Sequence, residues 1–391
     1  MTTVWDQTIV GQPHTHVLLL GVGAYRHLRG GSDYKPELTT LSRLRQLTSP
    51  PISARKFTDW LLKELNNPDA PLGSVELLLS EQPQTLYERP DGLGINTDPA
   101  TIGNIKEAFK RWYERCNAHE DNIAIFYFCG HGVMVGGDHI LLLEDYGANT
   151  LKPFETAIHF ERMLRGMAKC KARCQCYFID ACSEVSVELL RIEETGAEFF
   201  IQSDLMKPSD KALVLGASAP GDSAYAPPGQ TSRFTDALLQ CLNGLSSEKN
   251  QGKWVVATDN LIRMVIRVVN QLNNQSRGGY RQQVSHSGSL EPRQLHVREK
   301  PPLVPITIRF DPRKAIGEAR LALQSQRDRS WHREREPAVL DWELDPPIEA
   351  GRYDLSVRFP SGRYQEINEV LWVTPPGPWP DPDPISCKEN Q

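Results

Sequence analysis

Short apolar runs alternate with amphipathic segments over most of the chain before Pro301. Continuous apolar runs are typical of strands buried on both faces of a sheet, and they occur at residues 16–22, 75–79, 123–128, 140–143, 174–179 and 212–217. Apolar positions at helical spacing predict helices at residues 53–65, 101–116, 160–169, 185–194, 234–242 and 260–272. Strands that alternate with helices predict an α/β domain, residues 1–300, with a mostly parallel sheet covered on both faces.

The pattern changes after Pro301 and Pro302 to shorter runs separated by turn sequences. They predict the strands of a small, sandwich-like all-β domain over residues 301–375, at 304–310, 338–344, 353–359 and 370–373. A charged stretch, residues 315–336, is predicted to form a partly helical insertion in this domain. The proline-rich tail, residues 376–391, has the composition of a disordered segment.

Length and composition limit the classes of function. The chain has 391 residues, of which 39% are hydrophobic, so it can form one large and one small domain. Eight cysteines show no disulfide-scaffold spacing, and neither a signal peptide nor a membrane-spanning apolar run is evident, so we expect a reduced, cytoplasmic protein without a membrane partner. The net charge of −5 weighs against nucleic acid as a partner.

Two of the apolar runs end in a small-residue turn that carries one reactive side chain. His131 follows the run at 123–128, and Cys182 follows the run at 174–179. The carboxyl ends of parallel strands share one edge of a sheet, which is where ligands bind in such folds. A thiol beside an imidazole is the nucleophile–base pair of a cysteine peptidase.

Cys182 requires its neighbours because an unperturbed thiol is mostly protonated at neutral pH. His131 is the candidate base, and the same imidazole can later protonate the leaving amine. The helix predicted to begin at residue 185 would add the positive end of its dipole, which favours a thiolate.

The motifs around these residues resemble those of a known family. Cys129-Gly-His-Gly132 and Asp180-Ala-Cys182, on alternating strands and helices, are similar to the caspase-like clan, and more to bacterial orthocaspases and metacaspases than to animal caspases. The resemblance covers roughly residues 14–290. It implies a three-layer sandwich, a thiol endopeptidase that acts on proteins or peptides, and no obligatory cofactor.

The resemblance also assigns roles to individual residues. The backbone N–H groups of Gly132 and Cys182 would form the oxyanion hole. Asp180 would lie in the S1 pocket and pair with a basic P1 side chain, Arg before Lys, because a guanidinium can bind a carboxylate through two bonds. The structural alternative for Asp180 is a cap on the helix that follows. The chain departs from the family pattern at Ser53, where metacaspases place a second S1 acid, and at Glu184, where glycine is usual.

Metal binding has weak support in the sequence. A zinc site needs about four ligands, and no His pair completes the cluster of Cys170, Cys174 and Cys176, so we expect no metal. Some metacaspases require calcium, but an EF-hand spacing is missing from the acidic group of Asp91, Asn96 and Asp98.

His139 and His159 are the alternative bases. Neither follows a buried strand with flanking glycines, so we expect packing or surface roles for both.

These features favour a Cys–His endopeptidase, with activity gated by a regulatory protein partner through the β domain, as in similar bacterial proteases of defence or cell-death pathways. The alternative is a caspase-like scaffold or binding protein with weak catalysis. Self-cleavage is common in the family after the catalytic segment, and Arg191 and Lys211 are the candidate sites, whereas Pro208 disfavours Lys207.

Overall fold

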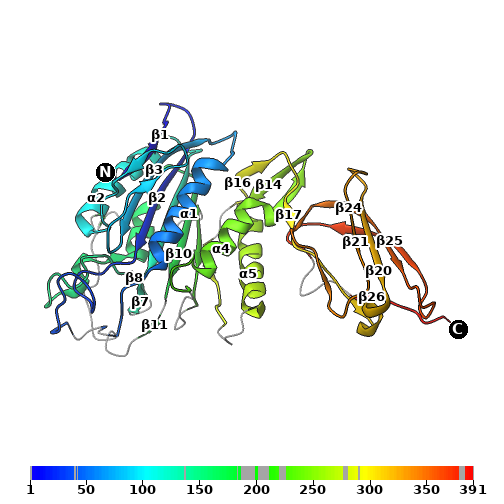
Figure 1. Cartoon of the computed structure of the whole chain (residues 1–391). Coiled ribbons are helices and arrows are strands. Elements are labelled where there is room, and N and C mark those ends of the chain that lie inside the picture. The colour runs from blue at the N-terminus through cyan, green and yellow to red at the C-terminus, as the bar shows by residue number, and fades with distance from the viewer. Residues whose placement is uncertain are drawn as a thin grey trace. The chain divides into compact units, whose positions relative to one another are not determined.

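The computed structural model describes residues 2–38, 41, 43–135, 138–182, 184–185, 199–200, 211–219, 226–275, 281–288, 291–377 and 384–390 (Figure 1). The chain divides into two compact units. The first comprises Met1–Leu239 and Ala257–Val297, and the second comprises Gln240–Val256 and Arg298–Gln391. Residues 240–256 therefore group with the C-terminal part, whereas the sequence pattern places them in the first domain.

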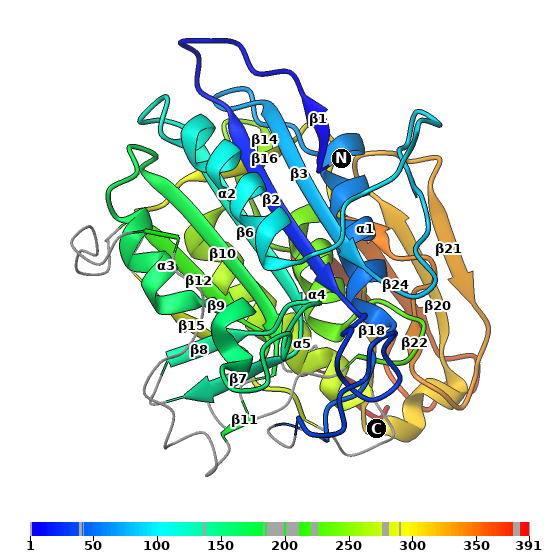
Figure 2. The same ribbon diagram turned by 90° about the vertical axis from the view of Figure 1, so that its left-hand side faces the viewer.

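A seven-stranded sheet forms the centre of the first unit (Figure 2). Its order is β1 (Thr3–Asp6), β3 (Leu72–Ser80), β2 (Thr15–Val22), β6 (Ile123–Gly130), β10 (Cys174–Ala181), β12 (Ala212–Gly216) and β15 (Ser285–Ser287). The five inner strands are parallel, and the two edge strands run antiparallel to their neighbours. Every residue of β2, β6, β10 and β12 is buried, which is why their sequences are continuous apolar runs. The predicted mostly parallel sheet is confirmed.

Helices cover both faces of this sheet. One face carries α2 (Ile102–Cys116) and α3 (Phe160–Met167), and the other carries α1 (Ser49–Lys63), α4 (Arg233–Gln240) and α5 (Thr258–Gln275) (Figures 1 and 2). Helix α1 begins four residues before the predicted start because prolines occupy its first turn, where a missing N–H costs nothing. Within the described residues, no helix is both long and apolar enough to cross a membrane.

A small second sheet lies in the same unit, with the order β11 (Glu184–Val185), β7 (Gly132–Val135), β8 (Asp138–Leu141) and β9 (Ile158–His159). The helix predicted at 185–194 is wrong at its start, because the backbone of β11 pairs in parallel with β7. Residues 186–194 lie outside the described part of the chain. The described residues of this unit also form β4 (Tyr87–Glu88), β5 (Gly94–Ile95), the 3-10 helix Pro153–Thr156 and β16 (Gln294–Arg298).

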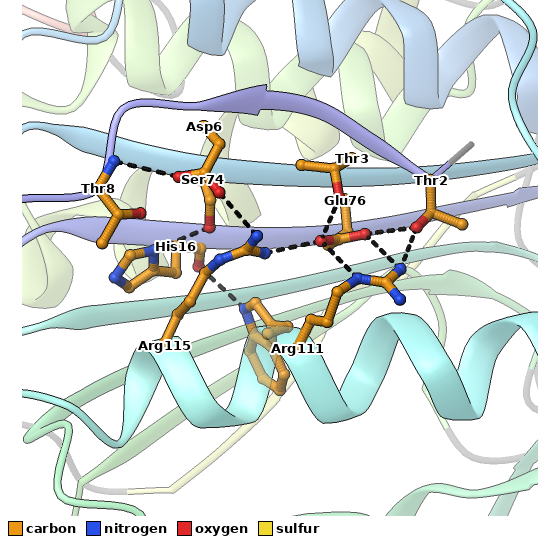
Figure 3. Close-up of polar contacts among 10 residues, drawn as sticks. Thr2, Thr3, Asp6, Thr8, His16, Ser74, Glu76, Arg111 and Arg115 are labelled. Carbon is orange, nitrogen blue, oxygen red and sulfur yellow. Dashed lines mark hydrogen bonds and ion pairs between the residues drawn. The ribbon is translucent and has the colours of Figure 1, made fainter.

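The N-terminal strand β1 is fastened to the sheet edge by one buried carboxylate (Figure 3). Glu76 of β3 is inaccessible to solvent, and its oxygens accept hydrogen bonds from Thr2 at 2.6 Å and Thr3 at 2.8 Å. From α2, Arg111 and Arg115 bind the same carboxylate at 3.0 and 2.7 Å. The hydrogen bonds from Arg111, Thr2, Arg115 and Thr3 together outweigh burial and lower the pKa of Glu76.

The second unit is rich in strands, as predicted. Its main sheet is antiparallel, with the order β21 (His332–Arg335), β20 (Arg320–Ser325), β24 (Gly351–Arg358) and β25 (Ile367–Val373). Short two-stranded ladders pair β17 (Leu303–Val304) with β23 (Ile348–Glu349), β18 (Thr307–Ile308) with β22 (Trp342–Glu343), and β19 (Phe310–Asp311) with β26 (Ile385–Ser386). The unit also contains the π-helical turn Cys241–Leu245 and the strands β13 (Ser247–Asn250) and β14 (Lys253–Ala257), which form a hairpin.

Two predictions for this unit are wrong. Residues 315–336 are not an insertion: they are helical only at their start, in the 3-10 helix Arg313–Glu318, and then form β20 and β21 of the main sheet. In β20 the buried Leu321 and Leu323 alternate with more exposed positions, so its charged residues reflect a strand with one wet face. The tail is not disordered at residues 384–390, since β26 pairs with β19 and Cys387 is buried.

Candidate active site

The sheet register places His131 and Cys182 side by side. In the β6–β10 pair, Gly130 lies opposite Ala181, and the β7–β11 pair beyond them keeps the same offset of 51 residues. His131 and Cys182 stand between these two ladders with that same offset. Neighbouring strands are about 4.8 Å apart, so the register brings these two residues to adjacent positions at the carboxyl edge of the sheet.

His131 is buried and held at two points. Its backbone N–H donates to the Tyr25 hydroxyl at 2.7 Å, and its Nε2 lies 2.7 Å from the carbonyl oxygen of Arg45. A carbonyl oxygen only accepts hydrogen bonds, so Nε2 carries the proton in the neutral ring. This tautomer leaves Nδ1 as the basic nitrogen that can take the proton of a thiol.

Tyr25 connects the end of β2 to the end of β6. Its side chain is fully buried, its ring centroid is 4.8 Å from that of His131, and its hydroxyl donates to Val22 O at 3.1 Å. Burial raises the pKa of Tyr25, so the hydroxyl keeps its proton. Gln46 in turn binds the backbone of Tyr25, accepting from its N–H at 2.7 Å and donating to its carbonyl at 3.0 Å. The neighbouring carbonyl of Arg45 is thereby fixed near the His131 ring.

Both glycines around His131 are required by close neighbours. A Cβ on Gly130 would lie 2.8 Å from the Tyr25 hydroxyl. A Cβ on Gly132 would lie 2.5 Å from Nε2 of His139 and 2.7 Å from the carbonyl oxygen of Cys182. The Gly-His-Gly sequence therefore reflects packing within the site itself.

Cys182 is half-buried, and the carbonyls on both sides of it are bound by side chains. The Ser218 hydroxyl donates to Ala181 O at 2.8 Å, and Nε2 of His139 lies 2.9 Å from Cys182 O. The helix dipole expected behind the thiol is not provided by the described residues that follow it, because Glu184–Val185 is a strand.

Asp180 is buried in a cluster of hydroxyl groups. Its side chain is 3% exposed, and its Oδ2 accepts hydrogen bonds from Thr235 at 2.6 Å and from Ser232. Burial raises the pKa of Asp180, while the bonds from Ser232 and Thr235 oppose that rise. Ser53 joins the cluster by accepting the Ser232 N–H at 3.0 Å. The fold thus brings together Asp180 and the position that departs from the metacaspase pattern.

The alternative role for Asp180, a cap on the helix that follows it, does not describe its contacts. The described residues directly after it form no helix, and its partners Ser232 and Thr235 lie at the start of α4 instead. Ser232 Oγ accepts the Thr235 N–H at 3.0 Å and so caps that helix itself. Asp180 supports this cap from one step further away.

The remaining candidates from the sequence are the alternative base His159 and the possible metal ligands. His159 is the N-cap of α3, where its ring accepts the Arg162 N–H, and its Nε2 is 3.1 Å from Asp138. Among the described residues, no group of three or more His, Cys, Asp or Glu side chains is arranged to hold a metal ion. The three cysteines considered as zinc ligands, Cys170, Cys174 and Cys176, are all buried.

Of the candidate processing sites, Arg191 and Lys207 lie outside the described residues. Lys211 lies inside them, and its backbone carbonyl accepts the Gln175 N–H at 2.9 Å.

Tyr25, Gln46, Ser218 and Ser232 are site residues that the sequence motifs do not reveal. The only sequence signal for Tyr25 is its place just after the turn that ends the first apolar run.

The chain shows similarity to known proteins. Residues 85–292, more than half of the chain, match the model of the caspase domain. Over 181 residues the chain is 33% identical to an uncharacterized protein, y4kE, of Sinorhizobium fredii (strain NBRC 101917 / NGR234). The matched segment covers 46% of this chain and 51% of that protein. The chain therefore spans about half the length of this curated relative. A crystal structure of caspase-1 from Spodoptera frugiperda matches with a TM-score of 0.43 and 12% identity, over 74% of this chain and 91% of that chain.

Proposed function

Since this chain belongs to the caspase domain family, which is a family of cysteine peptidases, we propose that it is an endopeptidase in which Cys182 is the nucleophile and His131 the base. The shared offset of the β6–β10 and β7–β11 ladders carries this proposal, because it sets the two residues side by side at the carboxyl edge of the sheet. The tautomer of His131 supports it, because Nδ1 is then the nitrogen that can accept a proton.

The proposed reaction follows from these groups. Cys182 Sγ passes its proton to Nδ1 of His131 and bonds to the substrate carbonyl carbon, while the carbonyl electron pair moves onto oxygen. His131 then protonates the leaving amine as the C–N bond breaks, which leaves a thioester on Cys182. Water, deprotonated by the same imidazole, hydrolyses the thioester and releases the acid and the free thiol.

The backbone N–H groups of Gly132 and Cys182 are the proposed oxyanion donors. The two groups of a planar trans peptide point in opposite directions. His131 O accepts the Leu142 N–H at 2.9 Å, so the Gly132 N–H of the same peptide points away from β8. Ala181 O accepts from Ser218, so the Cys182 N–H points away from Ser218.

Asp180 is the proposed S1 residue for a basic P1 side chain. Its carboxylate is desolvated, which favours a cation as its partner and disfavours an acidic P1 residue. Arg is expected to be preferred to Lys, because a guanidinium can form two bonds to one carboxylate. Ser53 offers only a hydroxyl at the place of the second metacaspase acid, so the selectivity would depend on Asp180 alone.

The proposal is tested by comparing the full chain with Cys182→Ala and His131→Ala on peptides with P1 Arg, Lys and Asp. Each substitution should abolish cleavage, and the double variant should be hardly worse, because residues of one catalytic unit are not additive. A thiol-reactive P1-Arg probe should label the wild type and not Cys182→Ala. Hydrolysis that persists in Cys182→Ala would refute the assignment and favour the scaffold alternative.

The proposed role of residues 301–375 is to bind a regulatory protein partner. This segment contains no cysteine and a single histidine, His332, so it has no catalytic pair of its own. Apolar side chains are nevertheless exposed in it, with Leu340 at 71% and Trp372 at 60%. A partner that covered these side chains would gain free energy by removing their apolar surface from water.

A further inference from the structure

We infer that His139 and Ser218 are a pair of positioning residues for the nucleophile, each holding one of the two peptide planes that meet at the Cα of Cys182. This inference rests on the proposed function, because it concerns how the Cys182 main chain is presented to a substrate. The side chains come from opposite flanks of β10, from β8 and from the turn after β12. Neither belongs to the sequence motifs around Cys182.

The first plane is the peptide between Ala181 and Cys182. The Ser218 hydroxyl donates to Ala181 O at 2.8 Å, and Ser218 itself is 2% exposed. The turn that carries it is tied down by Ala217, whose N–H donates to Ile179 O and whose carbonyl accepts from Gln282, both at 2.8 Å. Because the peptide is planar, fixing this carbonyl also fixes the direction of the Cys182 N–H, one of the proposed oxyanion donors.

The second plane begins at the carbonyl of Cys182. Nε2 of His139 lies 2.9 Å from this oxygen and must carry the proton, since a carbonyl cannot donate. The space is tight, because a Cβ on Gly132 would meet both the His139 ring and this oxygen within 3 Å. With both planes fixed, the backbone dihedrals of Cys182 are fixed, and so is the direction of its Cα–Cβ bond.

The groups around His139 keep it in this role. Its backbone N–H donates to Glu161 Oε2 at 2.7 Å, and the next groups in the cluster are His159, 3.9 Å from the same carboxylate, and Asp138, 3.1 Å from His159. Burial lowers the pKa of His139, so the ring is neutral at neutral pH. A neutral ring whose Nε2 is bound to Cys182 O acts on the main chain, and the base remains His131.

Three reactions of the same thiol differ in whether they need an oxyanion donor. Peptide hydrolysis and reaction with a peptidyl acyloxymethyl ketone both place negative charge on a carbonyl oxygen, so they depend on a correctly aimed N–H. Alkylation by iodoacetamide displaces iodide at a saturated carbon and forms no oxyanion. Loss of the positioning bonds should therefore slow the first two reactions and leave the third unchanged.

The test uses the full chain with two matched pairs of variants. His139→Phe keeps a ring but removes the donor, and His139→Gln restores an N–H at a similar reach. Ser218→Ala removes the hydroxyl, and Ser218→Thr retains it. For each we would measure kcat and KM on a P1-Arg peptide, the inactivation rate with a P1-Arg acyloxymethyl ketone, and the rate of Cys182 alkylation by iodoacetamide between pH 5 and 9, with near-UV circular dichroism as the check on folding.

We expect kcat and ketone inactivation to fall by roughly tenfold to a hundredfold in His139→Phe and in Ser218→Ala, as for other misplaced oxyanion donors. KM and the alkylation profile should stay close to wild type, and His139→Gln and Ser218→Thr should recover most of the loss. Wild-type kcat in folded His139→Phe and Ser218→Ala would overturn the inference while leaving the proposed function intact. The inference would also be overturned if Cys182 alkylation slowed as much as kcat, or if His139→Gln and Ser218→Thr recovered none of the lost kcat. A wild-type chain without hydrolysis would instead refute the proposed function itself.

Discussion

One phenolic hydroxyl joins two strand ends at the candidate active site. Tyr25 accepts the His131 N–H and donates to Val22 O, and its ring packs against the imidazole. At the scale of single residues, such groups decide whether the base is aimed correctly. They take no part in the chemistry, so only the structure identifies them.

Tyr25→Phe should remove these two hydrogen bonds while keeping the ring contact. The His131 N–H is buried and would lose its partner, so we expect the free energy of unfolding to fall by about 1–3 kcal/mol, with a lower kcat on peptides. Urea unfolding and steady-state kinetics would measure both. Tyr364→Phe is the matched control, because within the described residues the Tyr364 hydroxyl is buried without a partner. Its loss should leave kcat unchanged and should not lower the stability. An unchanged kcat in Tyr25→Phe would contradict the positioning role.

Replacing Asp180 should improve stability at neutral pH and reduce cleavage after Arg. Burial raises its pKa in the folded chain above the ordinary value of 3.8, so the folded state holds this proton more tightly than the unfolded state. Stability should therefore decline as the pH rises from about 4 through the raised pKa, and remain lower above it. Asp180→Asn should remove this decline, yet it should cut cleavage after Arg by more than about tenfold. The measurements are unfolding curves across pH and kcat/KM for P1-Arg peptides. Stability of Asp180→Asn that falls with pH as in the wild type would contradict the assigned shift.

At the scale of elements, β1 depends on the Glu76 cluster shown in Figure 3. Glu76→Gln would leave Arg111 and Arg115 without their carboxylate, and we expect a loss of about 3 kcal/mol, at the low end for buried pairs because Arg111 is 38% exposed. The folded pKa of Glu76 is lowered, so its contribution is present above the unfolded pKa, near 4.5, and disappears as the pH falls through the folded pKa. Acid titration of stability in wild type and Glu76→Gln checks this, with Glu88→Gln at the exposed position of β4 as the control. Equal stability of the two proteins at pH 7 would exclude the clamp.

The elements also show what a sequence can predict. Strands such as β6 and β10 are predictable because both of their faces are buried, so their apolar runs are unbroken. Strand β11 was missed because its partner, β7, is brought to it by the fold and leaves no local pattern. The candidates His131 and Cys182 can be picked out from the sequence because each directly follows one of these unbroken apolar runs. The bonds of Ser218 and His139 to the Cys182 main chain cannot, since they arise from register and packing.

At the scale of the whole molecule, the two units have separate apolar cores. Leu20 lies in the core of the first, and Leu323 in the core of the second, and both are fully buried. If residues 301–375 regulate the enzyme and do no chemistry, damage to the second core should spare peptide hydrolysis. The cores thus offer a test that leaves the chain at full length.

Leu323→Ala should destabilise the second unit by about 2–5 kcal/mol, the usual cost of a cavity in a packed core. Calorimetry would identify a temperature at which this unit has unfolded and the first has not. At that temperature, kcat on a short P1-Arg peptide should remain within about twofold of wild type. Leu20→Ala is the matched control, because β2 carries the turn to Tyr25, and it should lower kcat together with the stability of the first unit. If Leu323→Ala abolishes peptide hydrolysis under these conditions, the second unit is part of the catalytic fold, and a purely regulatory role for it is wrong.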